Sequence, residues 1–275
     1  MSPEDSKNKL PIKGNWKLTM GRVAFLNCDP LFHSLPSPWK VLPAPPSWLT
    51  GHLLRRDCVI APIPAADYAK NSDNLILIPE LGICSKGEVG SVLLFGTSKV
   101  EDMKTIALPS DSSSSVALLK YIVKMKNLNP KYVTMAPEIG EMLKNCDGAL
   151  LIGDRALDYA KDEPSNIQLD LGSAWLELTK RPMVFGVFAA RKDTPIEDVK
   201  NAQRALLERL ELFENSSVCR NSVIESSIEK SGLSKQRLEK YFGEVFNRLD
   251  QNHINGLNHF LIEACAMDEG AEFYW

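Results

Sequence analysis

Short apolar runs alternate with helical patterns along most of this chain, and this alternation limits the possible folds more than any other feature. Runs such as Val92–Gly96 and Gly148–Ile152 are apolar along their whole length rather than at every second position. A strand of this kind is covered on both faces, which is typical of parallel sheets packed between helices. The pattern therefore predicts an α/β fold, and the helical periodicity after Pro195 predicts a helical C-terminal segment.

The alternation runs through the chain twice, which predicts two lobes. Strands are expected within 17–26, 58–63, 75–79, 92–96, 105–108, 131–134, 148–152 and 183–190. Helices are expected at 47–56, 65–70, 115–125, 137–144, from 154 onward and at 172–178. The predicted division is a flexible tail at 1–17, a first lobe of 18–97 plus 184–275, and a second lobe of 98–183. Gly96 and Gly186 are expected at the crossings, because glycine tolerates backbone rotation there.

The charge balance favours a small-molecule partner. Lys and Arg number 32 against 35 Asp and Glu, a formal net charge of −3, so no excess of basic residues indicates nucleic acid or an anionic membrane. No apolar run approaches the roughly 18 residues that a membrane span requires. The polar N-terminus lacks the apolar stretch of a secretory signal, so a cytoplasmic protein is expected. The oligomeric state is left open.

Neither a metal nor a cofactor is predicted. The six cysteines contain no C-x-x-C pair, and the four histidines show no metal-ligand spacing. Most of the cysteines lie in apolar runs, which favours buried, reduced thiols. The sequence also lacks a P-loop, a dinucleotide-binding fingerprint and a G-x-S-x-G nucleophile turn.

The Ser-rich turn Ser110–Ser115 is the clearest candidate for a binding site. It joins a predicted strand to a predicted helix, so serine hydroxyls and free N–H groups converge at the positive end of a helix. Such an arrangement holds a carboxylate or a phosphate. The alternative is ordinary helix capping, although one capping serine accounts for only one or two of the five.

Two further polar residues follow predicted strands, where ligands of open α/β sheets bind. Asn27 could hold a hydroxyl or a carboxylate, or it could simply close an Asx-turn. Asp154 could form a polar pocket wall, or it could cap the helix that it begins. The residues alone thus predict a two-lobed α/β protein that binds a small anion, and they leave open whether it is an enzyme.

Six segments, in this order, resemble the chorismate dehydratases of the futalosine route to menaquinone. They are Gly21–Phe32, Ile60–Tyr68, Gly87–Leu94, Ala107–Leu119, Leu150–Leu157, and Asp170–Trp175 followed by Pro182–Phe185. The resemblance implies a periplasmic-binding-protein-like fold of type 2 with mixed or parallel sheets. It also implies conversion of chorismate, a dicarboxylate, to 3-[(1-carboxyvinyl)oxy]benzoate and water without a cofactor.

The resemblance also implies roles for individual residues. Asn27 matches the family's strand-end asparagine and is the expected catalytic residue. The expected substrate-binding residues are Ser91, Ser110, Ser114, Ser115, Asp154 and Ile63. The chain departs from the family at Thr179-Lys180-Arg181-Pro182, where two cations either attract the dianion or form a solvated corner.

Three alternative functions are weighed against this one. A solute-binding protein of a transporter would normally carry an export signal. The related dihydroxynaphthoate synthase shares the fold but has a Ser-Pro-Cys-Pro-Asn-Asp-type motif and uses a histidine, and neither occurs in the matching places. A ligand-sensing regulatory domain would be expected with a helix-turn-helix or a basic face.

Overall fold

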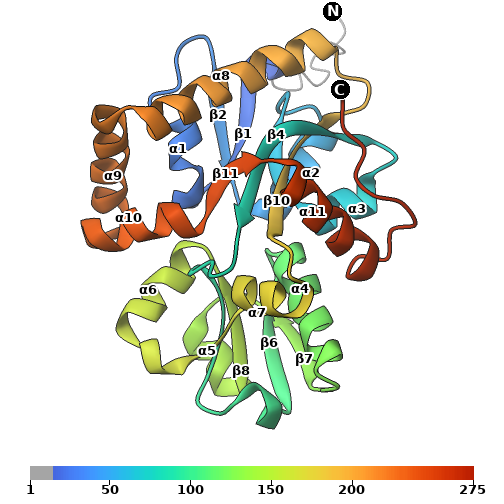
Figure 1. The fold of residues 1–275 in the computed structure, drawn as a ribbon, viewed down its shortest axis with the longest axis vertical. Helices are drawn as coiled ribbons and strands as arrows, with labels where there is room; N and C mark the ends of the chain where they lie inside the picture. Colours follow the sequence, from blue (N-terminus) through green and yellow to red (C-terminus); the bar gives the residue numbers. More distant parts are fainter. Residues whose placement is uncertain (1–14) are drawn as a thin grey trace, which may run out of the picture.

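A computed structural model describes residues 15–275, which form two lobes around two separate β-sheets (Figure 1). The first lobe holds a four-stranded sheet of order β11-β4-β10-β3. Its strands, all antiparallel to their neighbours, are β3 (Ala61–Pro64), β4 (Leu75–Ser85), β10 (Met183–Arg191) and β11 (Phe246–Leu249). A parallel pair, β1 (Thr19–Val23) and β2 (Lys40–Ala44), adjoins this sheet through a bridge between Met20 and Ile60.

The second lobe holds a five-stranded sheet of order β7-β6-β8-β5-β9. The strands are β5 (Val92–Gly96), β6 (Thr105–Pro109), β7 (Lys131–Met135), β8 (Gly148–Ile152) and β9 (Ile167–Asp170). The pairs β6–β7 and β6–β8 are parallel, whereas β5 is antiparallel to both of its neighbours. The first sheet is therefore antiparallel and the second is mixed, which confirms the expected fold with mixed sheets, although the fully apolar strands β5 and β8 pair antiparallel with each other.

Helices cover both sheets, which is why the central strands are apolar on both faces. In the first lobe these are α1 (Asp29–Phe32), α2 (Pro46–Leu54), α3 (Ala65–Asn71), α8 (Ile196–Asn215), α9 (Ser217–Ser231), α10 (Lys235–Glu244) and α11 (Gln251–Glu263). In the second they are α4 (Ser113–Met125), α5 (Ile139–Asn145), α6 (Asp154–Asp162) and α7 (Leu171–Thr179). All five residues of β5 and of β8 are buried beneath them. No helix within residues 15–275 has the length and apolar character to cross a membrane.

The predicted crossings between the lobes are misplaced. Because β5 pairs with β8 and β9, residues 92–96 belong to the second sheet, and the chain crosses at 86–91 rather than after residue 97. The glycines with positive φ at this crossing are Gly87 and Gly90, whereas Gly186 lies inside β10. The return crossing precedes Met183, the first residue of β10.

Several element boundaries also differ from the sequence expectations. The expected tail at 1–17 falls mostly outside the described residues, and Trp16–Leu18 forms a 3-10 turn. The strand expected at 17–26 covers only Thr19–Val23, because a second 3-10 turn forms at Leu26–Cys28. The strands β2, β9 and β11 were not predicted; β2 contains Pro43, which an edge strand tolerates.

Candidate functional site

A cavity lies between the two lobes and encloses about 540 Å³ of space free of atoms, including the solvent at its mouth. The part of it that could hold a ligand or water is only about 60 Å³, well below the roughly 300–1,000 Å³ of typical small-molecule sites, so a ring-sized ligand requires the surrounding structure to move. Its walls come from both lobes and from the crossing at 86–91. The lining residues are Val23, Phe25, Asn27, Pro46, Ile63, Pro64, Ile83, Val89, Ser91, Val92, Ser112, Ser114, Ser115, Ile152, Gly153, Phe185, Gly186 and Val245. Five predicted residues thus come together here: Asn27, Ile63, Ser91, Ser114 and Ser115.

Asn27 lies in the 3-10 turn that follows β1. Its side chain lines the cavity, and its Oδ1 atom is buried without a hydrogen-bond partner within the described residues. A buried, unpaired amide oxygen costs free energy unless a ligand satisfies it. The geometry therefore favours a contact with a ligand over the Asx-turn interpretation.

The turn that carries Asn27 is anchored by Asp29, two residues further along the chain, whose carboxylate is almost completely buried. The Arg22 guanidinium pairs with Asp29 Oδ1, and the Ser227 hydroxyl donates to Oδ2 at 2.8 Å. Lys230 Nζ lies 3.0 Å from the same Oδ2. Two residues of α9 therefore hold the end of this turn, which restricts where the Asn27 amide can lie.

The Ser-rich turn divides its residues between different tasks. Ser112 occupies the N-cap position of α4, but its side chain makes no capping bond and lines the cavity. The Ser114 hydroxyl accepts a hydrogen bond from Ala66 N in the other lobe at 3.1 Å, which leaves its own proton free to be donated. Since the first N–H groups of a helix lack partners within it, the α4 N-terminus offers donors to an anion here.

Two of the predicted residues do not line the cavity. Ser110 is exposed, and its backbone N–H extends the β6–β7 ladder by donating to Met135 O at 3.1 Å. Asp154 begins α6, and its Oδ1 accepts from Leu26 N at 3.0 Å, so it joins the second lobe to the turn that carries Asn27. Burial raises the pKa of the Asp154 carboxyl to about 6.

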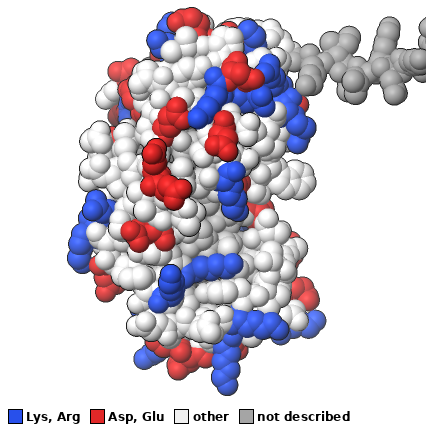
Figure 2. Space-filling model, turned by 90° about the vertical axis from the view of Figure 1, so that its right-hand side faces the viewer, with Lys and Arg blue, Asp and Glu red and all other residues white. Residues whose placement is uncertain are grey.

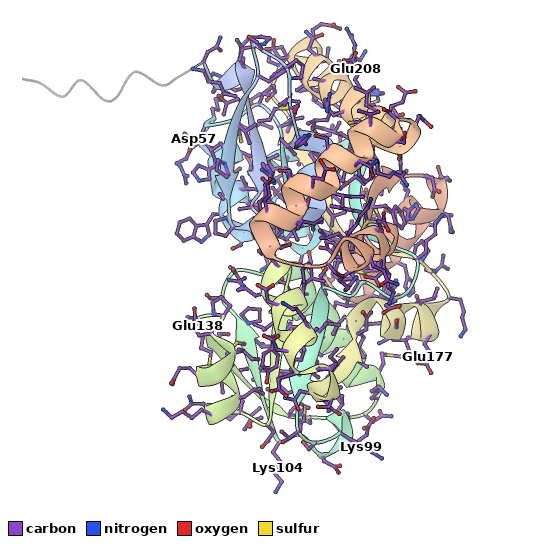
Figure 3. All side chains as sticks on the ribbon, turned by 90° about the vertical axis from the view of Figure 1, so that its left-hand side faces the viewer. Asp57, Lys99, Lys104, Glu138, Glu177 and Glu208 are labelled. Atoms are coloured by element: carbon purple, nitrogen blue, oxygen red, sulfur yellow. The ribbon has the colours of Figure 1, made fainter. Side chains whose placement is uncertain are left out.

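Among the described residues, none that lines the cavity carries a formal charge. Arg155 lies near the lining residue Phe25, but its guanidinium is paired with Asp111 at 2.6 Å. Lys180 and Arg181, the departure from the family pattern, are exposed and outside the lining. Charged side chains such as Lys99, Lys104, Glu138 and Glu208 point outward from the lobes in Figure 3. On the face drawn in Figure 2, acidic and basic side chains are interspersed.

No group of three or more His, Cys, Asp or Glu side chains in residues 15–275 is placed to hold a metal ion. The cavity instead offers hydroxyls, one amide and backbone N–H groups between apolar and aromatic walls. This chemistry suits a small organic anion with an apolar ring.

Comparison with known proteins agrees with this chemistry. A family described as menaquinone biosynthesis matches residues 18–266. The chain belongs to this menaquinone biosynthesis family. A relative from Thermus thermophilus, named chorismate dehydratase, is 29% identical over 93% of this chain and 97% of its own length. The menaquinone biosynthesis family match and this relative confirm the resemblance inferred from the six sequence segments.

Solved structures confirm the predicted fold. A protein from Archaeoglobus fulgidus is 19% identical with a TM-score of 0.69, and the match covers 90% of this chain and 97% of that one. A Candida albicans protein described as having the generic periplasmic binding protein fold is 13% identical, with a TM-score of 0.63. The match covers 92% of this chain and 91% of that one. The alkanesulfonate-binding protein of Xanthomonas axonopodis, solved with bound MOPS, is 14% identical with a TM-score of 0.60. The match covers 90% of this chain and 93% of that one. This member of the menaquinone biosynthesis family therefore has a periplasmic-binding-protein fold.

Sequence reasoning missed several parts of the cavity. Phe25 and Phe185 form aromatic walls, and Ser112 adds a hydroxyl, but none of them was singled out individually. Phe25 follows β1 and Phe185 lies within β10, so each resembles an ordinary core residue in the sequence. Only the arrangement of the two lobes shows that these rings face a shared space.

Proposed function

We propose that this protein is a chorismate dehydratase that forms 3-[(1-carboxyvinyl)oxy]benzoate and water in menaquinone biosynthesis through futalosine. The observation that carries the proposal is the match to the Thermus thermophilus chorismate dehydratase along nearly the whole of both chains. The reaction class is that of a carbon–oxygen lyase. The six free cysteines agree with a reducing cytoplasm, which we propose as its location.

The lining of the cavity supports a cyclic dicarboxylate as the substrate. Ser91, at the crossing between the lobes, and Ser112 and Ser115, at the α4 N-terminus, provide two groups of donors from different segments. Each group could receive one carboxylate through charge-assisted hydrogen bonds. Phe25, Phe185 and the aliphatic residues would then cover the ring.

The reaction does not require a strong general acid or general base from the protein. One ring C–H bond breaks, its electron pair becomes a ring π bond, and the C–O bond to the neighbouring hydroxyl breaks, so that a proton and hydroxide leave as water. The gain of an aromatic ring makes this elimination strongly favourable. An amide is a poor base, so we assign Asn27 the task of orienting the leaving hydroxyl or the group that accepts the proton.

The substrate itself carries a suitable proton acceptor. Its enolpyruvyl group is attached, through an ether oxygen, to the ring carbon that loses the proton, so the carboxylate of that group lies close to the breaking C–H bond. The lining of the cavity contains no ionisable side chain that would act as the base. In this mechanism the protein contributes mainly orientation, which can lower a barrier substantially when reacting groups are held in place.

The test is to incubate the purified protein with chorismate alone and to detect the product by mass spectrometry and aromatic absorbance. Loss of one water from chorismate, without any added cofactor, is the expected result. Calorimetry on the same samples separates the alternatives. Chorismate that binds but is recovered unchanged would indicate a solute-binding protein instead, and no binding at all would reject the substrate.

A further inference from the structure

One side chain of the C-terminal helical segment, Tyr241 of α10, lies behind the cavity wall and contacts a residue that lines the cavity. This tyrosine is completely buried, and its hydroxyl lies 3.2 Å from Ser91 Oγ. Ser91 lines the cavity and is itself almost completely buried. A residue that is 150 positions away in the sequence therefore contacts a proposed substrate ligand.

The direction of this hydrogen bond determines what Ser91 can do. A phenol is more acidic than an aliphatic hydroxyl, so Tyr241 is the better donor and Ser91 Oγ the acceptor. Burial also raises the pKa of Tyr241, which keeps the phenol protonated. Within residues 15–275 the Ser91 hydroxyl makes no other side-chain hydrogen bond, so its own proton is free to point into the cavity.

Helix α10 is held firmly against the loop that precedes Ser91. Arg237 Nη1 lies 2.9 Å from Glu244 Oε2, and its Nη2 donates to Gly90 O at 3.4 Å. Lys240 Nζ lies 3.0 Å from Glu88 Oε1 on the same loop. Gly90 has no room for a side chain, since a Cβ would lie 2.3 Å from Glu244 Oε2.

The second lobe holds this loop from its other side. Asp170, the N-cap of α7, accepts hydrogen bonds from Gly90 N at 2.8 Å and from Val89 N at 3.1 Å. Gly153 N also donates to Ser91 O at 2.7 Å. The Ser91 backbone is thus fixed by both lobes, and the remaining freedom is the rotation of its hydroxyl.

We propose that Tyr241 is a positioning residue that orients the Ser91 hydroxyl as a donor to a substrate carboxylate. The proposal rests on the proposed function, because it assigns that hydroxyl to a carboxylate of chorismate. It gives the C-terminal helices a role in the site through Ser91, in addition to packing.

The test compares Tyr241→Phe, Ser91→Ala and the double variant by steady-state kinetics with chorismate. Phenylalanine keeps the ring packing of Tyr241 and removes only the donor. We expect Tyr241→Phe to lower kcat/KM about five- to tenfold, mainly through KM, because one orienting hydrogen bond is lost. In the Ser91→Ala background the same change should alter kcat/KM less than about twofold, because the two residues act as a unit.

Tyr68→Phe is the matched control. Tyr68 is also buried, and its hydroxyl accepts from Glu272 N at 2.9 Å, outside the cavity. This variant should lose thermal stability while keeping the parental kcat and KM. The proposal would be overturned if Tyr241→Phe kept the parental kcat/KM. It would also be overturned if the double variant lost kcat/KM by the product of the two single-variant losses, because the two residues would then act independently. Either result requires an active parent protein, so it is distinguishable from failure of the proposed function, in which the parent leaves chorismate unchanged.

Discussion

Asn27 contributes an amide, rather than an ionisable group, to the lining of the cavity. If the amide orients the reacting groups, Asn27→Ala should lower kcat by about 100-fold or more, equivalent to about 2.7 kcal/mol of transition-state stabilisation, with little change in KM. Asn27→Asp adds a base but also a charge that repels a dianionic substrate. Steady-state kinetics on both variants test the assignment. An Ala variant with the parental kcat would remove Asn27 from the mechanism. An active Asp variant would indicate that a carboxylate of the protein can accept the ring proton.

The ionisation of the Asp154 carboxyl is expected to make the stability of the fold depend on pH. Its pKa is raised by burial from 3.8 to about 6, so the folded chain holds this proton more tightly than the unfolded chain does. The stabilising contribution is therefore complete below pH 3.8 and is lost as the pH rises through about 6. Asp154→Asn keeps an oxygen to accept from Leu26 N but does not ionise. Its free energy of unfolding should exceed that of the parent by up to about 3 kcal/mol at pH 7.5.

Denaturant unfolding at several pH values measures this difference, which should disappear below pH 4. The exposed Asp162→Asn, at the other end of α6, is the control and should show no such pH-dependent gain. Since the Leu26 contact is kept, Asp154→Asn should also retain the parental kcat. A stability difference that does not vary with pH would show that Asp154 does not titrate in this way.

The N-terminus of α4 differs from ordinary capped helices in this chain. The N-cap side chain Ser112 makes no capping bond, whereas Ser216 at the start of α9 accepts from Cys219 N at 3.3 Å. Ser112→Ala should therefore raise KM for chorismate with little loss of thermal stability. Ser216→Ala should do the reverse, losing about 1 kcal/mol of stability while keeping the parental KM.

Melting curves and kinetics on this pair separate binding from capping. If Ser112→Ala is destabilised as much as Ser216→Ala and its KM is unchanged, the serine turn is only a helix cap. Ser114→Ala is a poorer test, because it also leaves the buried Ala66 N–H without its acceptor, which by itself costs about 1–3 kcal/mol.

The two lobes are expected to separate when a ligand enters. Asn27 is 8% exposed, Ser91 3% and Ser115 4%, so a ring-sized molecule cannot reach them without movement of the surrounding structure. Cross-lobe hydrogen bonds, such as Leu26 N to Asp154 and Ala66 N to Ser114, would have to break and re-form. Hinged closure of this kind is typical of periplasmic-binding-protein folds.

Small-angle X-ray scattering is expected to show a smaller radius of gyration for the protein saturated with product than for the free protein. The crossing at 86–91, with positive φ at Gly87 and Gly90, is the expected hinge. Superimposable scattering curves at saturating product would mean that the lobes are already closed, and that the ligand enters by local movement of side chains.

The sequence determined those features that depend on local pattern. The strands Val92–Gly96 and Gly148–Ile152 were predicted with their observed bounds, because continuous apolar runs between turns indicate burial on both faces. The Ser-rich turn was predicted at a helix N-terminus because hydroxyl residues between a strand and a helix signal a cap. Six ordered segments were enough to identify the family and the fold.

Only the tertiary structure decided how distant segments meet. The edge strands β2, β9 and β11 are four or five residues long and depend on pairing with partners elsewhere, so their local pattern is weak. Strand β5 joined the second sheet because its partners β8 and β9 lie there, which moved the crossing to 86–91. The contacts of Leu26 with Asp154 and of Ser91 with Tyr241 join residues 128 and 150 positions apart. Periodicity and capping report on neighbours along a helix or strand, whereas these contacts arise from the packing of two lobes and a returning C-terminal segment.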